Sequence, residues 1–332
     1  MNIKKFSNEQ LAGQRLIVGF EGKKLNQELK FLIEELKIGG VILFSNNLSA
    51  PEQIKNLCSS VQEYARSCGQ PPLFIAVDQE GGEVARLKDP FTQFPGNPSM
   101  KNVKDAEKFA KITAKELSEV GINMNMAPVM DVIPEDLDSI MAGRVFGNDP
   151  AFVSKMGVSV IKHLQQNGIM AVAKHFPGIG KTALDSHNDL PILTSERSEL
   201  ESFDYLPFSA AIKAGVSAIM LSHILYSKID LDWPASLSVH IAKGLLRDHL
   251  GFKGLVMTDD LDMGAVVKNF NFNSVIHQIL SSEIDIVLIC HKGPNIKAAF
   301  KKILERIEES FEVMERGVAS VQRIMALKRQ YL

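Results

Sequence analysis

Short apolar runs alternate with longer amphipathic stretches along most of this 332-residue chain. Brief apolar runs bounded by turn residues are typical of buried strands, whereas apolar residues at a spacing of about 3.6 are typical of helices. The first pattern predicts eight strands, at residues 15–20, 39–44, 73–77, 122–129, 170–175, 216–222, 254–258 and 284–290. The second predicts helices near residues 26–36, 51–66, 103–120, 199–214 and 295–332.

Strands that alternate with helices along a chain usually pair in parallel through right-handed crossovers. About eight such units favour an α/β fold in which residues 1–332 form one catalytic (β/α)8 TIM-like barrel, not necessarily regular, with a C-terminal helix. A doubly wound sheet is the alternative, but it usually carries a glycine-rich phosphate-binding turn after its first strand. The residues at that place, Phe20-Glu-Gly-Lys-Lys, do not form such a turn.

Composition narrows the class of protein. The formal net charge is −2, so no overall field favours nucleic acid or a membrane surface as partner. Three widely spaced cysteines, Cys58, Cys68 and Cys290, suit a reducing compartment better than a disulfide framework. Residues 1–7 lack the apolar segment of a signal peptide, and no apolar run approaches the ~20 residues that span a bilayer. We therefore expect a cytoplasmic protein.

Barrel enzymes carry their chemistry where strands end, so the residues that follow each predicted strand are candidates. Asp78 follows the third strand, and Arg86 comes after two further glycines. A carboxylate can accept hydrogen bonds from neighbouring sugar hydroxyls, and an arginine can donate a fork of them. The alternative for both residues is a turn with a local ion pair.

The next three strands are also followed by polar residues. Asp131 follows the fourth strand, where we expect it to brace a loop, and Arg144 lies further along the same connection. Lys174 and His175 end the fifth strand, so this lysine is not easily explained as a surface residue. His223 follows the sixth strand, and a packed histidine with both ring nitrogens bonded is slightly favoured over contact with a ligand.

Three carboxylates, Asp259, Asp260 and Asp262, crowd the end of the seventh strand. Adjacent strand residues point to opposite faces, so Asp259 and Asp260 cannot both face the mouth of a barrel. One of them is therefore a candidate catalytic group and the other a structural one. The alternative is a set of acids placed at the start of a helix, where the helix dipole favours them.

A loop rich in proline and glycine follows the fifth strand and carries Asp185 and His187. In an extended loop, residues two apart point to the same side. Asp185 can then accept a hydrogen bond from one ring nitrogen of His187, which leaves the other nitrogen for substrate. The alternative is a loop whose polar side chains only satisfy its own backbone.

Seven segments between residues 13 and 291 together resemble glycoside hydrolase family three. They are Gly39-Gly-Val-Ile-Leu-Phe, Val77-Asp-Gln-Glu-Gly-Gly, Asn125-Met-Ala-Pro-Val-Met-Asp, Lys174-His-Phe-Pro-Gly, Asp185-Ser-His, Pro234-Ala-Ser-Leu-Ser and Met257-Thr-Asp-Asp-Leu-Asp-Met. The Asp-Ser-His triplet resembles the β-N-acetylglucosaminidase branch used in bacterial peptidoglycan recycling. The family's β-glucosidases lack this triplet and usually carry a second, sandwich domain.

This resemblance implies a retaining hydrolase of terminal N-acetylglucosamine, with N-acetylglucosaminyl muropeptides as substrates. Asp259 would attack the anomeric carbon, and His187, held by Asp185, would serve as acid and then as base. Five residues match the positions that grip the sugar: Asp78, Arg86, Arg144, Lys174 and His175. The resemblance implies no metal ion and no organic cofactor.

The chain departs from the family pattern at Ile179, where a histidine is usual, and at Lys181, where a small or acidic residue is frequent. Residues 135–141 also depart from the usual run rich in asparagine and proline. These departures leave open a non-catalytic sugar-binding protein, although the dyad and Asp259 are retained.

Two other enzyme classes also stay open. A phosphorylase would share the first step but use phosphate as acceptor, which a histidine tolerates better than a carboxylate does, by charge. A metal-dependent barrel hydrolase would use His175, His187, His223 and Asp259, but it would need an early His-X-His that this chain lacks.

Overall fold

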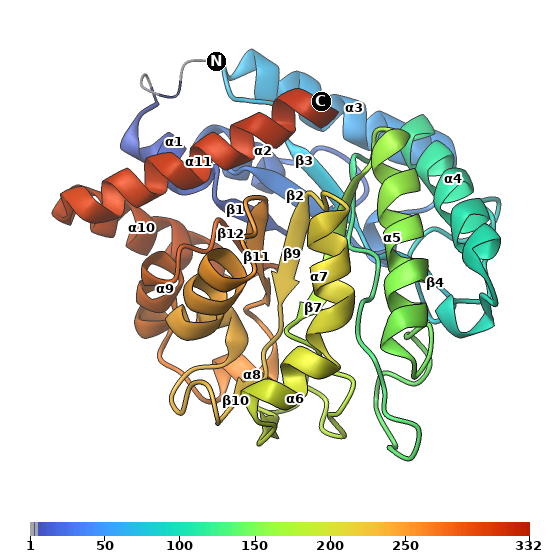
Figure 1. Ribbon diagram of the computed structural model, residues 1–332. Coiled ribbons are helices and arrows are strands. Elements are labelled where there is room, and N and C mark those ends of the chain that lie inside the picture. The colour runs from blue at the N-terminus through green and yellow to red at the C-terminus, as the bar shows by residue number, and fades with distance from the viewer. Residues whose placement is uncertain (1–2, 4–5) are drawn as a thin grey trace.

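The computed structural model describes Ile3 and residues 6–332, so residues 1–2 and 4–5 of the expected domain lie outside the described residues. Eight parallel strands close into a barrel, in the order β1-β12-β11-β9-β7-β6-β3-β2 (Figure 1). These strands are β1 (Leu16–Val18), β2 (Gly40–Leu43), β3 (Phe74–Val77), β6 (Met124–Asn125), β7 (Met170–Phe176), β9 (Ala218–Leu221), β11 (Leu255–Asp260) and β12 (Ile286–Ile289). The expected (β/α)8 barrel is confirmed, and the doubly wound alternative is excluded.

Each predicted apolar run contains one barrel strand, but the strand ends differ from the prediction. The run at 122–129 yields only the short β6, because Pro128 has no N–H to donate and the ladder continues as one isolated bridge between Val129 and Lys174. Strands β7 and β11 both run further than predicted, to Phe176 and Asp260. The residues at these two strand ends are therefore held within the sheet.

Within the described part of the chain, four short strands lie outside the barrel. Strands β4 (Gln79–Gly81) and β5 (Val84–Ala85) form an antiparallel hairpin, and β8 (Ile192–Leu193) pairs in parallel with β10 (Leu225–Tyr226). The hairpin follows directly on β3, so it belongs to the carboxyl end of the barrel.

Helices surround the barrel on its outer side (Figure 1). They are α1 (Asn8–Gly13), α2 (Gln27–Glu34), α3 (Pro51–Ser67), α4 (Val103–Glu119), α5 (Pro150–Gln166), α6 (Arg197–Ser202), α7 (Tyr205–Lys213), α8 (Gly264–Val267), α9 (Phe272–Ser281), α10 (Pro294–Glu309), α11 (Phe311–Tyr331) and a π-type helix at His240–His249. None of the helices in the described part of the chain combines the length and apolar character that a membrane crossing requires.

Two of the predicted helices are wrong as single elements. The stretch at 199–214 forms α6 and α7, which are separate helices. The stretch at 295–332 breaks at Ser310, where α10 ends and the serine hydroxyl accepts a hydrogen bond from the N–H of Val313 to cap α11. Apolar spacing continued across both breaks, so the sequence pattern did not reveal them.

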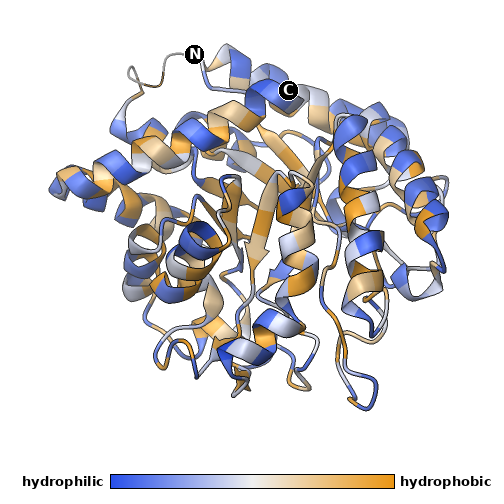
Figure 2. Ribbon diagram, viewed as in Figure 1, coloured by the Kyte–Doolittle hydropathy of each residue, from blue (hydrophilic) through white to orange (hydrophobic). Residues whose placement is uncertain are grey.

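The barrel interior is filled by side chains that point inward from the strands, and α11 closes its amino-terminal end. Ile324 of α11 belongs to the interior cluster, and Lys328 Nζ lies 5.2 Å from the centre of the Phe74 ring. Strands and inner helix faces are apolar, while the outer helix faces are polar (Figure 2). With one end closed, the opposite end, where the strands terminate, is available for a ligand.

Candidate active site

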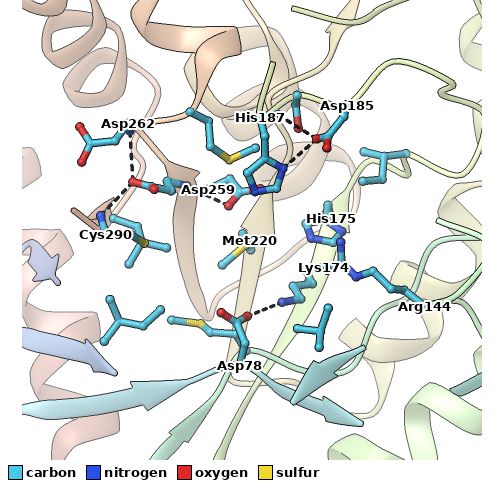
Figure 3. A pocket seen from close by; sticks show the side chains of 18 of the residues that line it. Asp78, Arg144, Lys174, His175, Asp185, His187, Met220, Asp259, Asp262 and Cys290 are labelled. Atoms are coloured by element: carbon cyan, nitrogen blue, oxygen red, sulfur yellow. Dashed lines mark hydrogen bonds and ion pairs between the residues drawn. The ribbon is translucent and has the colours of Figure 1, made fainter. Parts of the chain in front are cut away.

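A pocket of about 420 Å³ lies at the carboxyl ends of the barrel strands (Figure 3). A volume of this size suits a small organic ligand such as one sugar ring. Its floor is apolar, with Ile42, Met126 and Met220 among the residues, and its walls are charged. All eight residues that the sequence predicts for the site line this pocket: Asp78, Arg86, Arg144, Lys174, His175, Asp185, His187 and Asp259.

The alternation of strand residues explains why three charged side chains reach the pocket. Phe74 and Ala76 point into the barrel from β3, Met170 and Val172 from β7, and Leu255 and Met257 from β11. The next residue of the same parity on each strand has the same direction. These next residues are Asp78, Lys174 and Asp259. The inward pattern of each strand therefore ends in a charged group at the mouth of the barrel.

Lys174 is the centre of an ion-pair network on one wall of the pocket. Its Nζ lies 2.7 Å from Asp78 Oδ1 and 2.7 Å from Glu80 Oε1, and its side chain is only 3% exposed. The Arg144 guanidinium binds both oxygens of Glu80, at 2.7 and 3.0 Å. Arg86 lies 3.7 Å from the other oxygen of Asp78. A buried charge lowers the stability of the fold unless an opposite charge is paired with it. Each charged group of this network therefore depends on its partners.

Burial alone would raise the pKa of both Asp78 and Glu80. The Lys174 ammonium and the neighbouring arginines outweigh burial, so the pKa of each carboxyl lies below its ordinary value. Burial would likewise lower the pKa of Lys174, but the two carboxylates raise it above the ordinary value. All three groups are therefore charged at neutral pH, and they offer a ligand fixed donors and acceptors.

Glu80 is a buried residue that the sequence analysis did not single out. Two positions separate it from Asp78, and the same strand periodicity that places Asp78 inward would have placed Glu80 beside it. Within the described residues Glu80 does not line the pocket. It balances the charges of Lys174 and Arg144, which do. Lys174 thus has orienting partners that its position in the sequence did not reveal.

The three carboxylates at the end of β11 have different partners, as expected. Asp260 accepts hydrogen bonds from the backbone N–H groups of Cys290 and Asp262, at 2.9 and 3.1 Å, so it braces the loop that follows. Burial raises the pKa of Asp260 to about 6. Asp262 accepts from the Asn295 amide at 2.7 Å. Among the residues that the structure describes, Asp259 accepts a hydrogen bond only from the N–H of Asp260, at 2.8 Å.

Asp259 is thus the carboxylate of β11 that remains available to a ligand. Burial tends to raise its pKa, but the imidazoles of His223 and His175, the N–H of Asp260 and the Lys174 ammonium together hold it below the ordinary value. A low pKa keeps the group ionised at neutral pH, and an ionised carboxylate is a nucleophile.

Asp185 and His187 form a hydrogen-bonded pair above the pocket (Figure 3). Asp185 Oδ1 accepts from His187 Nδ1 at 2.7 Å and from the backbone N–H of His187 at 2.9 Å. The pairing is as expected, but the extended loop that we gave as its reason is wrong. The N–H of Asn188 donates to the Asp185 carbonyl at 2.9 Å, so the chain forms a tight turn that begins at the aspartate. Aspartate favours such turns because its side chain bonds the backbone two residues on.

The hydrogen bonds from His187 stabilise the ionised form of Asp185. Burial raises its pKa, but the backbone N–H and the imidazole of His187 outweigh burial and lower the pKa below the ordinary value. With Nδ1 bonded to Asp185, the Nε2 atom of His187 is left for a ligand. The His187 side chain is 70% exposed and that of Asp185 is 42% exposed.

The other two histidines of the predicted set have structural partners. His175 Nδ1 lies 2.8 Å from Asp131 Oδ2, and Asp131 also accepts from the N–H of Ile179, so it braces the loop as expected. His223 is buried, with its ring nitrogens bonded to Ser236 Oγ and to the Asp260 carbonyl. Burial lowers its pKa. His223 is therefore the packed histidine that the sequence slightly favoured.

The metal-dependent alternative finds no support in this geometry. Among the described residues, the potential metal ligands that come together are Asp260, Asp262 and His291, not the histidines of that hypothesis. Both ring nitrogens of His223 are already occupied.

Comparison with known proteins identifies relatives of the whole barrel. The family model described as the glycosyl hydrolase family 3 N-terminal domain matches residues 8–327. A beta-hexosaminidase A from Pseudoalteromonas piscicida is 34% identical over 97% of this chain, and a beta-hexosaminidase from Nitrosomonas eutropha is 33% identical over 83%. This chain spans 61% of the length of the first protein and 80% of the second.

Solved structures of similar proteins also match almost the whole of this chain. A glycoside hydrolase family 3 β-N-acetylglucosaminidase from Paenibacillus sp. superposes with a TM-score of 0.94 at 34% identity, over 98% of this chain and 63% of that one. A β-N-acetylhexosaminidase from Beutenbergia cavernae superposes with a TM-score of 0.90 at 26% identity, over 98% of this chain and 99% of that one.

Proposed function

Because this chain belongs to glycosyl hydrolase family 3, we propose that it removes terminal β-linked N-acetylglucosamine by a retaining double displacement. The observation that carries the proposal is one shared pocket, lined by the ionised Asp259 on one side and by the Asp185–His187 pair on another. A nucleophile and an oriented proton donor are the two groups that this reaction requires.

In the first step, a carboxylate oxygen of Asp259 attacks the anomeric carbon as the bond to the leaving oxygen breaks. The leaving oxygen takes the proton from Nε2 of the His187 imidazolium, which the Asp185 carboxylate stabilises through Nδ1. The products of this step are a covalent glycosyl-enzyme and the departing alcohol. In the second step, neutral His187 removes a proton from water, the water oxygen attacks the anomeric carbon, and Asp259 departs as a carboxylate.

The ion-pair network gives the sugar its fixed partners. Asp78 offers carboxylate oxygens, and Lys174, Arg86 and Arg144 offer donors from the same wall of the pocket. We assign these residues, together with His175, to binding of the N-acetylglucosamine ring. Because we assign them to binding of the sugar and not to proton transfer, we expect their replacement to affect every substrate alike.

We further propose that residues 1–332 act as one catalytic domain in the cytoplasm and that the natural substrates are N-acetylglucosaminyl fragments of peptidoglycan. The sequence resemblance to the recycling branch of the family supports the substrate. The three free, widely spaced cysteines support the compartment.

A panel of aryl β-glycosides that differ only at the 2-position tests the reaction class. The proposal predicts strong preference for the N-acetyl compound over the glucoside and release of the β-anomer first. Product analysis with and without phosphate decides between hydrolysis and phosphorolysis, since a sugar phosphate as main product would identify a phosphorylase. Preference for the glucoside would contradict the proposal.

The acid/base role of His187 is tested by the leaving group. Positioned acid/base catalysis is typically worth ~10²–10⁴ in rate, and it matters most when the leaving oxygen is strongly basic. His187→Ala should lose on that order with a disaccharide. With a dinitrophenyl glycoside the first step should change little, and a covalent intermediate should accumulate. Equal losses on both substrates, with no intermediate, would exclude His187 as the acid.

A further inference from the structure

The loop that carries the Asp185–His187 pair has no regular secondary structure between the end of β7 and the start of β8. The His187 side chain is largely exposed and that of Asp185 is half-buried, so side-chain packing fixes His187 only weakly. The position of His187 in the pocket must therefore depend on what holds the backbone of the loop.

Helix α8 and the residue that follows it, Lys268, hold that backbone through three hydrogen bonds. The N–H of Gly264 donates to the carbonyl of His187 at 3.1 Å, and the N–H of Ala265 donates to the carbonyl of Ser186 at 3.0 Å. Lys268 Nζ donates to the carbonyl of Asn188 at 2.8 Å. The bonds thus engage three consecutive residues, with His187 in the middle.

Gly264 allows the two segments to approach this closely. A Cβ atom at this position would lie 2.6 Å from the carbonyl oxygens of both His187 and Asn188. These are backbone atoms, which cannot swing aside as a flexible side chain can, so any larger residue would displace the loop. The φ of Gly264 lies outside the left-handed region, so close contact is the reason for glycine here.

Helix α8 also lies a few residues after the end of β11, which carries Asp259. The same short stretch of chain therefore carries the nucleophile and provides the surface on which the acid/base loop rests. The proposed reaction needs these two groups at a set separation on either side of the sugar carbon.

We propose that Gly264 and Lys268 are positioning residues of the proposed glycosidase reaction. By holding the backbone of the loop, they fix where His187 lies with respect to Asp259. They thereby set the distance between His187 and the leaving oxygen. This inference rests on the proposed function, because it assigns a role to α8 only if His187 is the acid/base. Neither Gly264 nor Lys268 is proposed to contact the substrate.

Gly264→Ala tests the inference, with Val267→Ala, an exposed position on the same helix, as the matched control. A displacement of about 1 Å at a catalytic group can cost roughly 10²-fold in rate. We expect a loss of about this size in kcat for N,N′-diacetylchitobiose and little change in the burst of dinitrophenol from the activated glycoside. Azide, an anionic nucleophile that needs no base, should restore turnover of the activated substrate.

Lys268→Met provides a second variant that introduces no clash, because it only removes the bond to the Asn188 carbonyl. It should show the same dependence on leaving group, with a smaller loss, and Lys268→Arg should restore activity by replacing the donor. A merely structural role for α8 would instead slow both substrates alike, and azide would not restore turnover.

The reference for these measurements is His187→Ala. If His187→Ala lowers the rate equally for good and poor leaving groups, the proposed function itself is wrong. If His187→Ala discriminates between the substrates but Gly264→Ala and Lys268→Met keep the wild-type ratio of rates, the proposed function stands and the positioning role of α8 is overturned.

Discussion

Replacement of Glu80 by glutamine is the perturbation whose effect follows most directly from the buried charges. The Glu80 side chain is 1% exposed, and its Oε1 lies 2.7 Å from both Lys174 Nζ and Arg144 Nη2. Glu80→Gln keeps the shape of the side chain but removes the negative charge that the two cations share. Lys174 then keeps Asp78 as its anionic partner, and Arg144 loses the carboxylate that it binds with two hydrogen bonds.

The magnitude follows from the cost of breaking a buried ion pair, which is about 3–5 kcal/mol. The lower end applies here, because Asp78 still neutralises Lys174 and the glutamine oxygen can still accept a hydrogen bond. We expect a loss of about 3 kcal/mol in the free energy of unfolding. The entropy of unfolding is about 2.1 cal/mol/K per residue, or about 0.7 kcal/mol/K for 332 residues, so Tm should fall by about 4 °C.

Urea unfolding at pH 7, followed by the fluorescence of the single tryptophan, Trp233, measures this loss. Glu83→Gln is the matched control, since Glu83 is an exposed carboxylate in the same β4–β5 connection. We expect Glu83→Gln to stay within about 0.5 kcal/mol of the wild type, as is usual for surface substitutions. A Glu80→Gln protein within that same margin would refute the claim that the network is a coupled set of buried charges.

Lys174→Ala should reduce kcat/KM by a similar factor for aryl and disaccharide substrates, because we propose that the lysine binds the sugar; an effect confined to poor leaving groups would indicate an acid role instead. Asp185→Asn should reduce disaccharide turnover in the same direction as His187→Ala but less, because the imidazole keeps one partner; a larger loss than in His187→Ala would contradict the orienting role. Burial raises the pKa of Asp204 to about 6, above its ordinary value of about 3.9, so the folded state holds the proton more tightly and stability should fall as the pH rises from about 4 to 6. Asp204→Asn should flatten that slope, as measured by urea unfolding at both pH values; an unchanged slope would show that another group is responsible.

The strands and much of the site could be predicted because both depend on local periodicity. Each predicted apolar run matches one barrel strand, although β7 and β11 extend beyond their runs, and the inward series Phe74–Ala76–Asp78 shows how a strand pattern continues into a residue that lines the pocket. Short helices such as α8 lack enough residues for a recognisable period. The break at Ser310 was hidden because apolar spacing continues across it.

The rest of the site depends on contacts between distant parts of the chain. Asp78 and Lys174 are separated by 96 positions, and Glu80 and Arg144 by 64, so no local pattern reveals that they pair. The Asp185–His187 pair is local, and residue types alone predicted that the two side chains could bond to each other. They did not predict its geometry, because a turn and an extended loop can both bring these two side chains together.

The central claim is that Asp259 is the nucleophile of a retaining double displacement, and trapping of the covalent intermediate tests it most directly. A fluorinated N-acetylglucosaminyl substrate that slows both steps should label the enzyme once. Mass spectrometry of the digested protein should then find the sugar on Asp259, and Asp259→Ala should fold normally but take no label. Label on Asp260 or Asp262, or turnover that depends on the substrate acetamide as nucleophile with no label at all, would contradict the account.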